Sequence, residues 1–333
     1  MKKVTICGGG SLGHVIAGWL AAKGKAKVSV LTNRPERWGK ELSIDTPNGE
    51  VLNGRLNKVS NKPEAVIPEA DVVLLCLPGF AIREELIKIK PALNTNTFVG
   101  SVFSSTGFFF EAMEILPESQ PLWGFQRVPF IARTAEYGHS AHLMGFKSGL
   151  NVAVERSEKK EEFRELMEEW FEIPVRLLNN YYEASLTNSN PLLHTSRLYT
   201  MFAKGQIYPR MINFYEEWTE EAADLLIKMD REFFALLDKL PVAKDYLPTI
   251  LDYYESHDAQ SLAAKLCSIQ GFKGIKSPMI ESKEGWVADF GSRYFTEDFP
   301  YGLKYIHDLA HKYNIEAPYI DKVFEWGINV NRK

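Results

Sequence analysis

The sequence predicts two domains of different class, an α/β domain with a doubly wound, mainly parallel sheet followed by an all-α domain. The length of 333 residues is typical of a chain with about two domains. Short apolar runs alternate with helical runs in the first half of the chain. After Asn180 these runs end, and apolar residues recur at helical spacing instead. We place the domains at residues 1–165 and 166–333, with the boundary inside the segment 155–185.

The first element is an apolar run at residues 4–7 that meets a Gly-x-Gly-x-x-Gly turn, and the turn opens a helix. Gly8 permits the sharp exit from the strand, Gly10 lets the backbone approach a pyrophosphate, and Gly13 lets the helix lie close to the sheet. An anion would bind the free N–H groups at the start of the helix. Because a second strand follows at 27–32, the stretch predicts a Rossmann domain that binds a dinucleotide. The cofactor-binding residues expected here are Gly8, Gly10, Ser11, Leu12 and Gly13.

The end of the second strand faces the adenosine ribose in this architecture. An acidic residue there would favour NAD, whereas a basic residue would accommodate the 2′-phosphate of NADP. No acid stands at the strand tip, where Asn33 and Arg34 follow Thr32. Arg34 and Arg37 could form a charge-assisted pair with a phosphate, or they could be two solvated loop arginines. We therefore expect NADP or NAD as the cofactor, with NADP slightly favoured.

A buried parallel strand is expected at residues 70–78, where an apolar run ends in a proline turn. Its carboxyl end should place Leu77 and Pro78 on the nicotinamide side of the crevice. The polar turn at 104–107 could contact a cofactor ribose or be a plain turn. The remaining elements expected in this domain are a helix at 81–90 and strands at 97–103, 141–146 and 151–154.

The second half of the chain is predicted to be helical. Apolar residues recur at helical spacing from Phe214 to Leu240, which indicates a long core helix. Pro300 suits the first turn of a helix at 301–313, and Asn314 suits its end. No Gly/Ser linker marks the boundary, so we expect the domains to pack closely around the ligand cleft. Further helices are expected at 261–269 and from Pro318 through Phe324.

The composition argues against several classes of protein. The net charge of −4, with basic residues spread along the chain, gives no indication of a nucleic-acid partner. The three cysteines (Cys7, Cys76 and Cys267) lack the spacing of a metal site, so we expect no metal. No signal peptide precedes the first strand, and no apolar stretch reaches membrane-spanning length. We expect a cytoplasmic protein whose oligomeric state is open, with a homodimer as one option.

Two stretches of the second half carry side chains suited to proton transfer. Asn190 and His194 share one face of a predicted helix, although Pro191 at a first helical position would make Asn190 an N-cap. Asp298 precedes a predicted helix, where it could cap that helix or orient and charge a histidine. Hydride delivery to a carbonyl or imine needs a group that supplies a proton, and His194 with Asp298 fits that need. Nothing in the local sequence shows that the two side chains meet.

The chain resembles the octopine/nopaline (opine) dehydrogenase family, within the 6-phosphogluconate-dehydrogenase-like superfamily. The specific motifs are NPLLH at 190–194 and RYFTEDFPYGL at 293–303. The supporting motifs are GGGSLGH at 8–14, LLCLPGF at 74–80, ARTAEYG at 132–138 and GFKSGLNVAV at 145–154. The glycine turn alone would not distinguish this family from the wider superfamily.

This resemblance implies a Rossmann domain followed by a helical domain, in agreement with the patterns described above. It implies reductive condensation of an amino acid's amine with a 2-oxo acid, or the reverse oxidation, with NADH or NADPH depending on the member. It further implies that His194 is the acid/base paired with Asp298 and that Asn190 helps to hold the substrate. Arg293 is a plausible partner for a substrate carboxylate, or it could brace Asp298.

Two other functions remain open from the sequence. A ketopantoate-reductase-like enzyme would act on a 2-oxo or hydroxy acid without an amine, but its acid/base is usually a lysine early in the helical domain. No lysine lies between Phe163 and Thr200. A dinucleotide-sensing protein would keep the Rossmann site without turnover, and the presence of Asn190, His194 and Asp298 argues against it.

Overall fold

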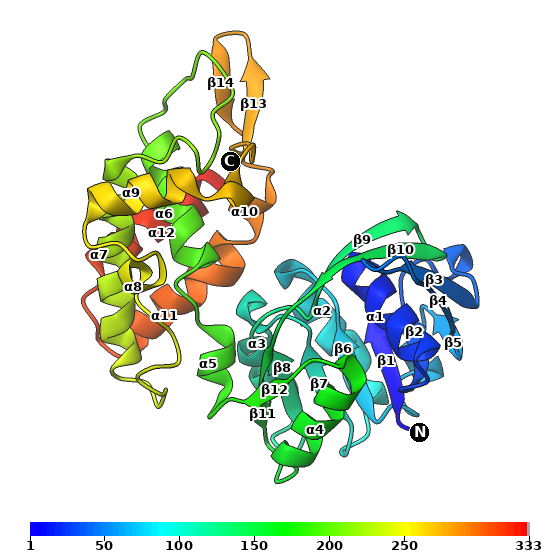
Figure 1. Ribbon diagram of the computed structural model, residues 1–333. Coiled ribbons are helices and arrows are strands. Elements are labelled where there is room, and N and C mark those ends of the chain that lie inside the picture. The colour runs from blue at the N-terminus through cyan, green and yellow to red at the C-terminus, as the bar shows by residue number, and fades with distance from the viewer. Residues whose placement is uncertain (332–333) are drawn as a thin grey trace. The chain divides into compact units, whose positions relative to one another are not determined.

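A computed structural model of the chain describes residues 1–331, which form an α/β unit and a mainly helical unit (Figure 1). This confirms the fold class predicted from the sequence. The first unit spans Met1–Ser185 and the second begins at Leu186. The first unit therefore continues beyond residue 165, because helix α4 (Lys160–Phe171) covers the sheet and strand β12 (Val175–Leu177) pairs with it.

The first unit is built on an eight-stranded sheet with the order β12-β11-β8-β7-β6-β1-β2-β5. Its pairing is parallel from β5 to β8, and β11 runs antiparallel to β8, so the sheet is mainly parallel as predicted. The chain passes from β1 to β2 on one side and returns to β6 on the other, which creates a switch point at the carboxyl ends of β1 and β6. These strands are β1 (Lys3–Cys7), β2 (Lys27–Leu31), β5 (Lys58–Ser60), β6 (Val72–Leu75), β7 (Phe98–Ser101), β8 (Leu122–Phe125), β11 (Leu150–Glu155) and β12.

Helices cover both faces of this sheet. On one face, α1 (Ser11–Ala22) and α4 bury aromatic and branched side chains, and Trp19 Nε1 donates to the carbonyl oxygen of Trp170 at 2.9 Å. On the other face, α2 (Gly79–Ile89) and α3 (Phe108–Ile115) form a second apolar core with residues from β6 and β7. The short helix α5 (Tyr181–Ser185) ends the unit. Two cores on opposite faces are what a doubly wound sheet requires.

A second sheet with the order β4-β3-β10-β9 packs against α1. Only the segment at 141–146 was predicted as a strand. The other strands are five to seven residues long, so their alternation of polar and apolar residues is a short signal. At its closest point a Cβ on Gly54 would lie 2.5 Å from the carbonyl oxygen of Gly18, so the strand backbone lies directly on the helix. The strands are β3 (Glu41–Asp45), β4 (Val51–Arg55), β9 (Phe130–Glu136) and β10 (Ser140–Phe146).

The second unit is mainly helical, as predicted, and includes one two-stranded ribbon of β13 (Met279–Ser282) and β14 (Gly285–Ala288). The long helix expected from Phe214 begins only at Glu220, because Thr219 caps it by accepting from the N–H of Ala222. Asn314 follows the end of α11 (Lys304–Lys312) with a positive φ of 54°, in agreement with the prediction. The helices are α6 (Asn190–Phe202), α7 (Glu220–Leu237), α8 (Ile250–Tyr253), α9 (Ala259–Ser268), α10 (Arg293–Thr296), α11 (Lys304–Lys312) and α12 (Pro318–Asn331).

Helix α6 lies in the interior of the second unit. Every residue from Pro191 to Leu198 is buried, so its polar side chains are enclosed rather than solvated. Helix α7 anchors its neighbours through buried carboxylates. Asp230 accepts from Asn188 Nδ2 at 2.8 Å and from the N–H of Ile250 at 2.9 Å, and burial raises its pKa to about 6. Among the helices described, none is long and apolar enough to cross a lipid bilayer.

Candidate active site

The glycine turn at the switch point has the geometry that close approach of a dinucleotide requires. Gly8 has a φ of 116°, and a Cβ there would lie 2.6 Å from the carbonyl oxygen of Cys76. A Cβ on Gly13 would lie 2.2 Å from the carbonyl oxygen of Gly8, so α1 touches the turn. A Cβ on Gly10, by contrast, would enter open space with no protein atom within 4 Å. The space beside Gly10 is therefore available to a pyrophosphate.

The start of α1 offers backbone donors to an anion. The first bond of the helix runs from the N–H of His14 to the carbonyl oxygen of Gly10, so the N–H groups of Ser11, Leu12 and Gly13 precede the hydrogen-bonded turns. The Ser11 side chain has a different role. Its Oγ lies 3.1 Å from Thr134 Oγ1 and accepts from the N–H of Thr134 at 3.1 Å, which ties α1 to β9. The backbone N–H of Ser11 is the group that points to a role in cofactor binding.

A cavity of about 260 Å³ opens beside this turn. Pro78 does not line it and instead occupies the N-cap position of α2. The cavity lining includes Gly8, Asn33, Arg34 and Leu77, all of which the sequence predicted for cofactor binding. It also includes Glu85, Lys88 and Tyr137, for which no sequence pattern provided a signal.

Basic side chains contribute to the electrostatics of this cavity. Arg34 is exposed at the end of β2, and Lys88 Nζ lies 3.5 Å from Glu85 Oε2. Burial raises the pKa of Glu85, while Lys88 lowers it. Arg37 does not line the cavity, because its guanidinium lies over the ring of Tyr137 at 4.8 Å. Of the two arginines predicted to meet a phosphate, Arg34 therefore has the better position.

His14 connects the glycine turn to the ribbon of β9 and β10. The N–H of Gly138 donates to His14 Nε2 at 2.7 Å, so Nε2 accepts and the protonated Nδ1 donates to the carbonyl oxygen of Gly10 at 2.9 Å. The imidazole stacks on Trp38 with ring centroids 4.2 Å apart. Burial lowers its pKa. A neutral histidine thereby fixes the peptide that would face the pyrophosphate.

In the second unit, His194 and Asp298 meet as a hydrogen-bonded pair. His194 Nδ1 lies 2.8 Å from Asp298 Oδ2, across a sequence separation of 104 residues. His194 is 8% exposed, because it projects from the buried helix α6. Asp298 directly precedes a π-helical turn (Phe299–Leu303), and its side chain makes no capping bond there. The capping interpretation of Asp298 is therefore wrong, and its carboxylate faces the imidazole.

Tyr215 completes this arrangement on the other side of the imidazole. Its hydroxyl lies 2.8 Å from His194 Nε2. In the neutral imidazole Nδ1 donates to the carboxylate, so Nε2 accepts and Tyr215 donates. Burial, followed by the nearby Tyr294, Tyr254 and Asp298, raises the pKa of Tyr215 far above its usual value. The hydroxyl consequently remains protonated and available as a donor.

Aromatic rings enclose this group. The ring of Tyr294 lies 4.7 Å from that of His194, and the ring of Phe214 lies 5.6 Å away. Burial and the nearby Asp298 raise the pKa of Tyr294. Such surroundings exclude water and strengthen the charge interactions of the pair. No sequence pattern points to Tyr215, which lies in the irregular segment between α6 and α7.

Asn190 and Arg293 lie at the starts of two helices of the same unit. Asn190 is exposed and is the first residue of α6, so it is not the N-cap that the sequence suggested; Ser189 holds that position. Arg293 is exposed at the start of α10, five positions before Asp298. Within residues 1–331 no ion pair joins Arg293 to Asp298, so bracing of that carboxylate is not what the structure shows.

Comparison with known proteins covers both units. Residues 177–331 match the family model described as NAD/NADP octopine/nopaline dehydrogenase, alpha-helical domain, and residues 4–108 match that of ketopantoate reductase PanE/ApbA. The opine dehydrogenase of Haliotis discus hannai and the octopine dehydrogenase of Pecten maximus are each 26% identical to the chain, over 98% of its length and 89% of theirs.

A solved structure gives the same result. The structure of an octopine dehydrogenase in complex with NADH and agmatine has a TM-score of 0.86 with the present structure, at 25% identity. The match covers 100% of this chain and 90% of that one. The resemblance predicted from the motifs is confirmed: residues 177–331 match the helical domain of the octopine/nopaline dehydrogenase family, and the chain is similar to opine and octopine dehydrogenases over nearly its whole length.

Proposed function

We propose that the protein is an NAD(P)-dependent opine-type dehydrogenase that reductively condenses an amino acid with a 2-oxo acid or catalyses the reverse oxidation. The observation that carries this proposal is the hydrogen-bonded pair of the buried His194 and the half-buried Asp298, set in the family's helical domain. The other unit of the same chain contributes the glycine turn and its cavity. One unit is suited to hold a dinucleotide, and the other is suited to move a proton.

The cofactor supplies the hydride when it is bound, and the first unit is built to hold it. The N–H groups at the start of α1 would bind the pyrophosphate, and the open space at Gly10 admits it. Arg34 and Lys88 place positive charge in the adjoining cavity, which supports NADP over NAD. Glu85 partly offsets that charge because it pairs with Lys88.

The second unit would supply the proton that reduction of a C=N or C=O bond requires. Negative charge grows on the substrate nitrogen or oxygen as the carbon is reduced, and a protonated His194 can neutralise it. Asp298 holds Nδ1 of the imidazole and stabilises its charged form. In the reverse direction the neutral imidazole accepts the proton.

Tyr215 controls access to the reactive nitrogen of His194. Its hydroxyl occupies the hydrogen-bonding position of Nε2, so a proton leaves His194 through that hydroxyl or after the tyrosine moves aside. We assign Tyr215 as a positioning residue that keeps the imidazole aligned between substrate cycles. Asn190 and Arg293 are assigned to substrate binding, because both are exposed near the helix starts of this unit and Arg293 can pair with a carboxylate.

The decisive experiment follows the absorbance of reduced nicotinamide with NADH and NADPH in separate reactions. Each reaction receives one 2-oxo acid from a panel, with or without a mixture of amino acids. Cofactor oxidation that requires both an oxo acid and an amine supports the proposal. Oxidation by an oxo acid alone would instead favour a ketopantoate-reductase-like activity. The match of residues 4–108 to the ketopantoate reductase model supports that alternative. Tight cofactor binding without oxidation by any pair would favour a dinucleotide sensor.

A homodimer is proposed as the assembled form. The ribbon of β9 and β10 exposes large apolar side chains, namely Ile131 at 52%, Met144 at 58% and Phe146 at 47%. Exposed large apolar side chains on two neighbouring strands suit an interaction surface. Light scattering on the purified protein would test the dimer, and a monomeric mass at all concentrations would rule it out. We also place the enzyme in the cytoplasm, which cell fractionation would test.

A further inference from the structure

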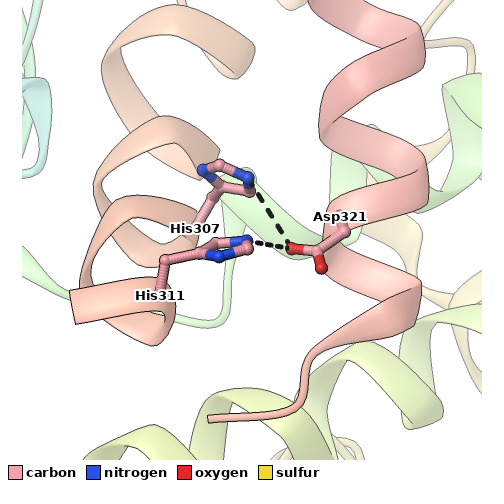
Figure 2. Close-up of side chains that lie close together, drawn as sticks. All are labelled: His307, His311 and Asp321. Atoms are coloured by element: carbon pink, nitrogen blue, oxygen red, sulfur yellow. Dashed lines mark hydrogen bonds and ion pairs between the residues drawn. The ribbon is translucent and has the colours of Figure 1, made fainter. Parts of the chain in front are cut away.

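A second group of ionisable side chains, none of which belongs to the His194 pair, lies close together in the helical unit (Figure 2). His307 and His311 lie one turn apart on α11, and Asp321 projects toward them from the first turn of α12. The cysteine spacing led us to expect no metal, but the His-x-x-x-His spacing on one helix face is a separate signal.

The donor atoms of the three side chains converge on one point. Asp321 Oδ1 lies 2.9 Å from His311 Nε2 and 3.6 Å from His307 Nε2. The possible ligand atoms all lie within 4.8 Å of one another. Zinc–nitrogen and zinc–oxygen bonds are about 2.0–2.2 Å long, so modest side-chain movement would bring all three atoms into coordination. The His311 side chain is 58% exposed and is free to make that movement.

The side chains around the cluster already orient its members. His307 Nδ1 lies 2.9 Å from Asp308 Oδ1, so Nδ1 carries the proton that the carboxylate accepts. The lone pair of Nε2 then faces Asp321. A carboxylate behind a ligating histidine is the usual second layer of a metal site. The His307 ring also packs on Phe324 with centroids 4.2 Å apart, which limits its rotation.

Asp321 is held from its own side. Helix α12 begins on the carboxylate of Glu232, whose oxygens accept from the N–H groups of Tyr319 at 3.0 Å and Ile320 at 2.8 Å. This contact fixes the first turn of α12 and with it the position of Asp321. Two of the three donors are therefore placed by contacts that do not depend on a metal.

We propose that His307, His311 and Asp321 form a binding site for a divalent transition metal of the zinc class. Two imidazoles and one carboxylate suit zinc and its neighbours, whereas magnesium and calcium prefer oxygen ligands alone. Three protein ligands leave a fourth position for water. The bound ion would cross-link α11 to α12. Because α11 continues from the π-helical turn after Asp298, the ion would also stabilise the segment that carries Asp298.

The test uses the full-length protein after treatment with a chelator. Calorimetric titration with zinc chloride should show a stoichiometric site in the wild type, and zinc should raise its unfolding temperature. His311→Ala and Asp321→Asn should each lower the zinc affinity by at least tenfold, and Asp308→Asn by about tenfold, the lower end of the range for an outer ligand. Magnesium chloride should produce neither binding nor stabilisation.

His257→Ala is the matched control, because His257 is an exposed histidine 3.7 Å from the carboxylate of Asp258 and, among the described residues, belongs to no group of three potential metal ligands. This variant should bind zinc as the wild type does. Circular dichroism would verify that each variant is folded. Absence of zinc binding by the wild type, or equal binding by His311→Ala and Asp321→Asn, would overturn the proposal. Neither outcome decides whether the protein is a dehydrogenase, because the cofactor-oxidation assay tests that proposal separately.

Discussion

The glycine turn of the first unit relies on backbone groups, whereas the His194 group of the second unit relies on side chains. At the turn the functional groups belong to the backbone, and added side-chain atoms at Gly8 or Gly13 would meet carbonyl oxygens within 2.6 Å. At the second site the functional groups are side chains, and each nitrogen of His194 already has a partner. The first site is therefore destroyed by adding atoms and the second by removing them, which makes the two functions separable by mutation.

The substitution His194→Ala is expected to separate catalysis from cofactor binding most clearly. Loss of a general acid–base residue should lower kcat by about 10²–10⁴-fold. Cofactor affinity should be unchanged, because His194 belongs to the second unit and the glycine turn to the first. Steady-state kinetics and fluorescence titration with NADPH measure the two quantities. If cofactor affinity fell together with kcat, His194 would have to be assigned a structural role.

Two single alanine substitutions in the glycine turn should instead lower cofactor affinity, and they should differ in their effect on stability. Gly10→Ala places a methyl group in open space, so the unfolding temperature should stay constant while the dissociation constant for the dinucleotide rises about 10–100-fold, as a cost of about 1–3 kcal/mol implies. Gly13→Ala should raise the constant and also lower the unfolding temperature, because its Cβ meets the Gly8 carbonyl oxygen at 2.2 Å. Equal thermal effects of both variants would contradict this distinction.

A smaller effect is expected from Tyr215→Phe, which sharpens the account of the second site. Removal of the hydroxyl leaves His194 Nε2 without its donor and costs about 1 kcal/mol, so kcat should fall about fivefold. The pH profile of kcat should shift as well, whereas loss of packing alone would not shift it. A rise in kcat would mean that the hydroxyl blocks the imidazole rather than aligning it.

An effect of similar size concerns cofactor choice at the first site. Arg34→Ala should raise KM for NADPH about fivefold and leave KM for NADH nearly constant, because an exposed ion pair contributes about 1 kcal/mol. Arg55→Ala is the matched control, since Arg55 is exposed on β4 and does not line the cavity. Equal changes for NADH and NADPH would show that Arg34 does not contact a 2′-phosphate.

The difference between the two sites also explains how much of each could be predicted. The glycine turn is a contiguous segment, so the spacing of Gly8, Gly10 and Gly13 predicts its geometry directly from the sequence. Asn33 and Arg34 could be placed because they follow a predictable strand. Lys88 could not, because it reaches the cavity from a helix whose exposed face has no distinctive pattern.

The His194 site could not be assembled from local patterns. His194 and Asp298 are 104 residues apart, and their pairing was implied by family resemblance before the structure showed the hydrogen bond. Tyr215 was missed, because a residue in an irregular segment carries no periodicity. Strands β3 and β4 were missed for a different reason, because each has only five residues and is half polar. Strand and helix faces are predictable from local sequence, whereas contacts between distant loops depend on the completed fold.

The His14 bridge between Gly10 and Gly138 is expected to make the dinucleotide site sensitive to acid. Burial lowers the pKa of His14, so the unfolded chain takes up a proton more readily than the folded one, and the stability that the neutral ring provides is lost as pH falls below about 6.5. A protonated Nε2 would then face the Gly138 N–H as a second donor. Dinucleotide affinity that falls on acidification in the wild type, but not in His14→Gln, would demonstrate this coupling. Uptake of one proton by His14 would therefore weaken its contact with Gly138 and loosen the β9–β10 ribbon from the glycine turn.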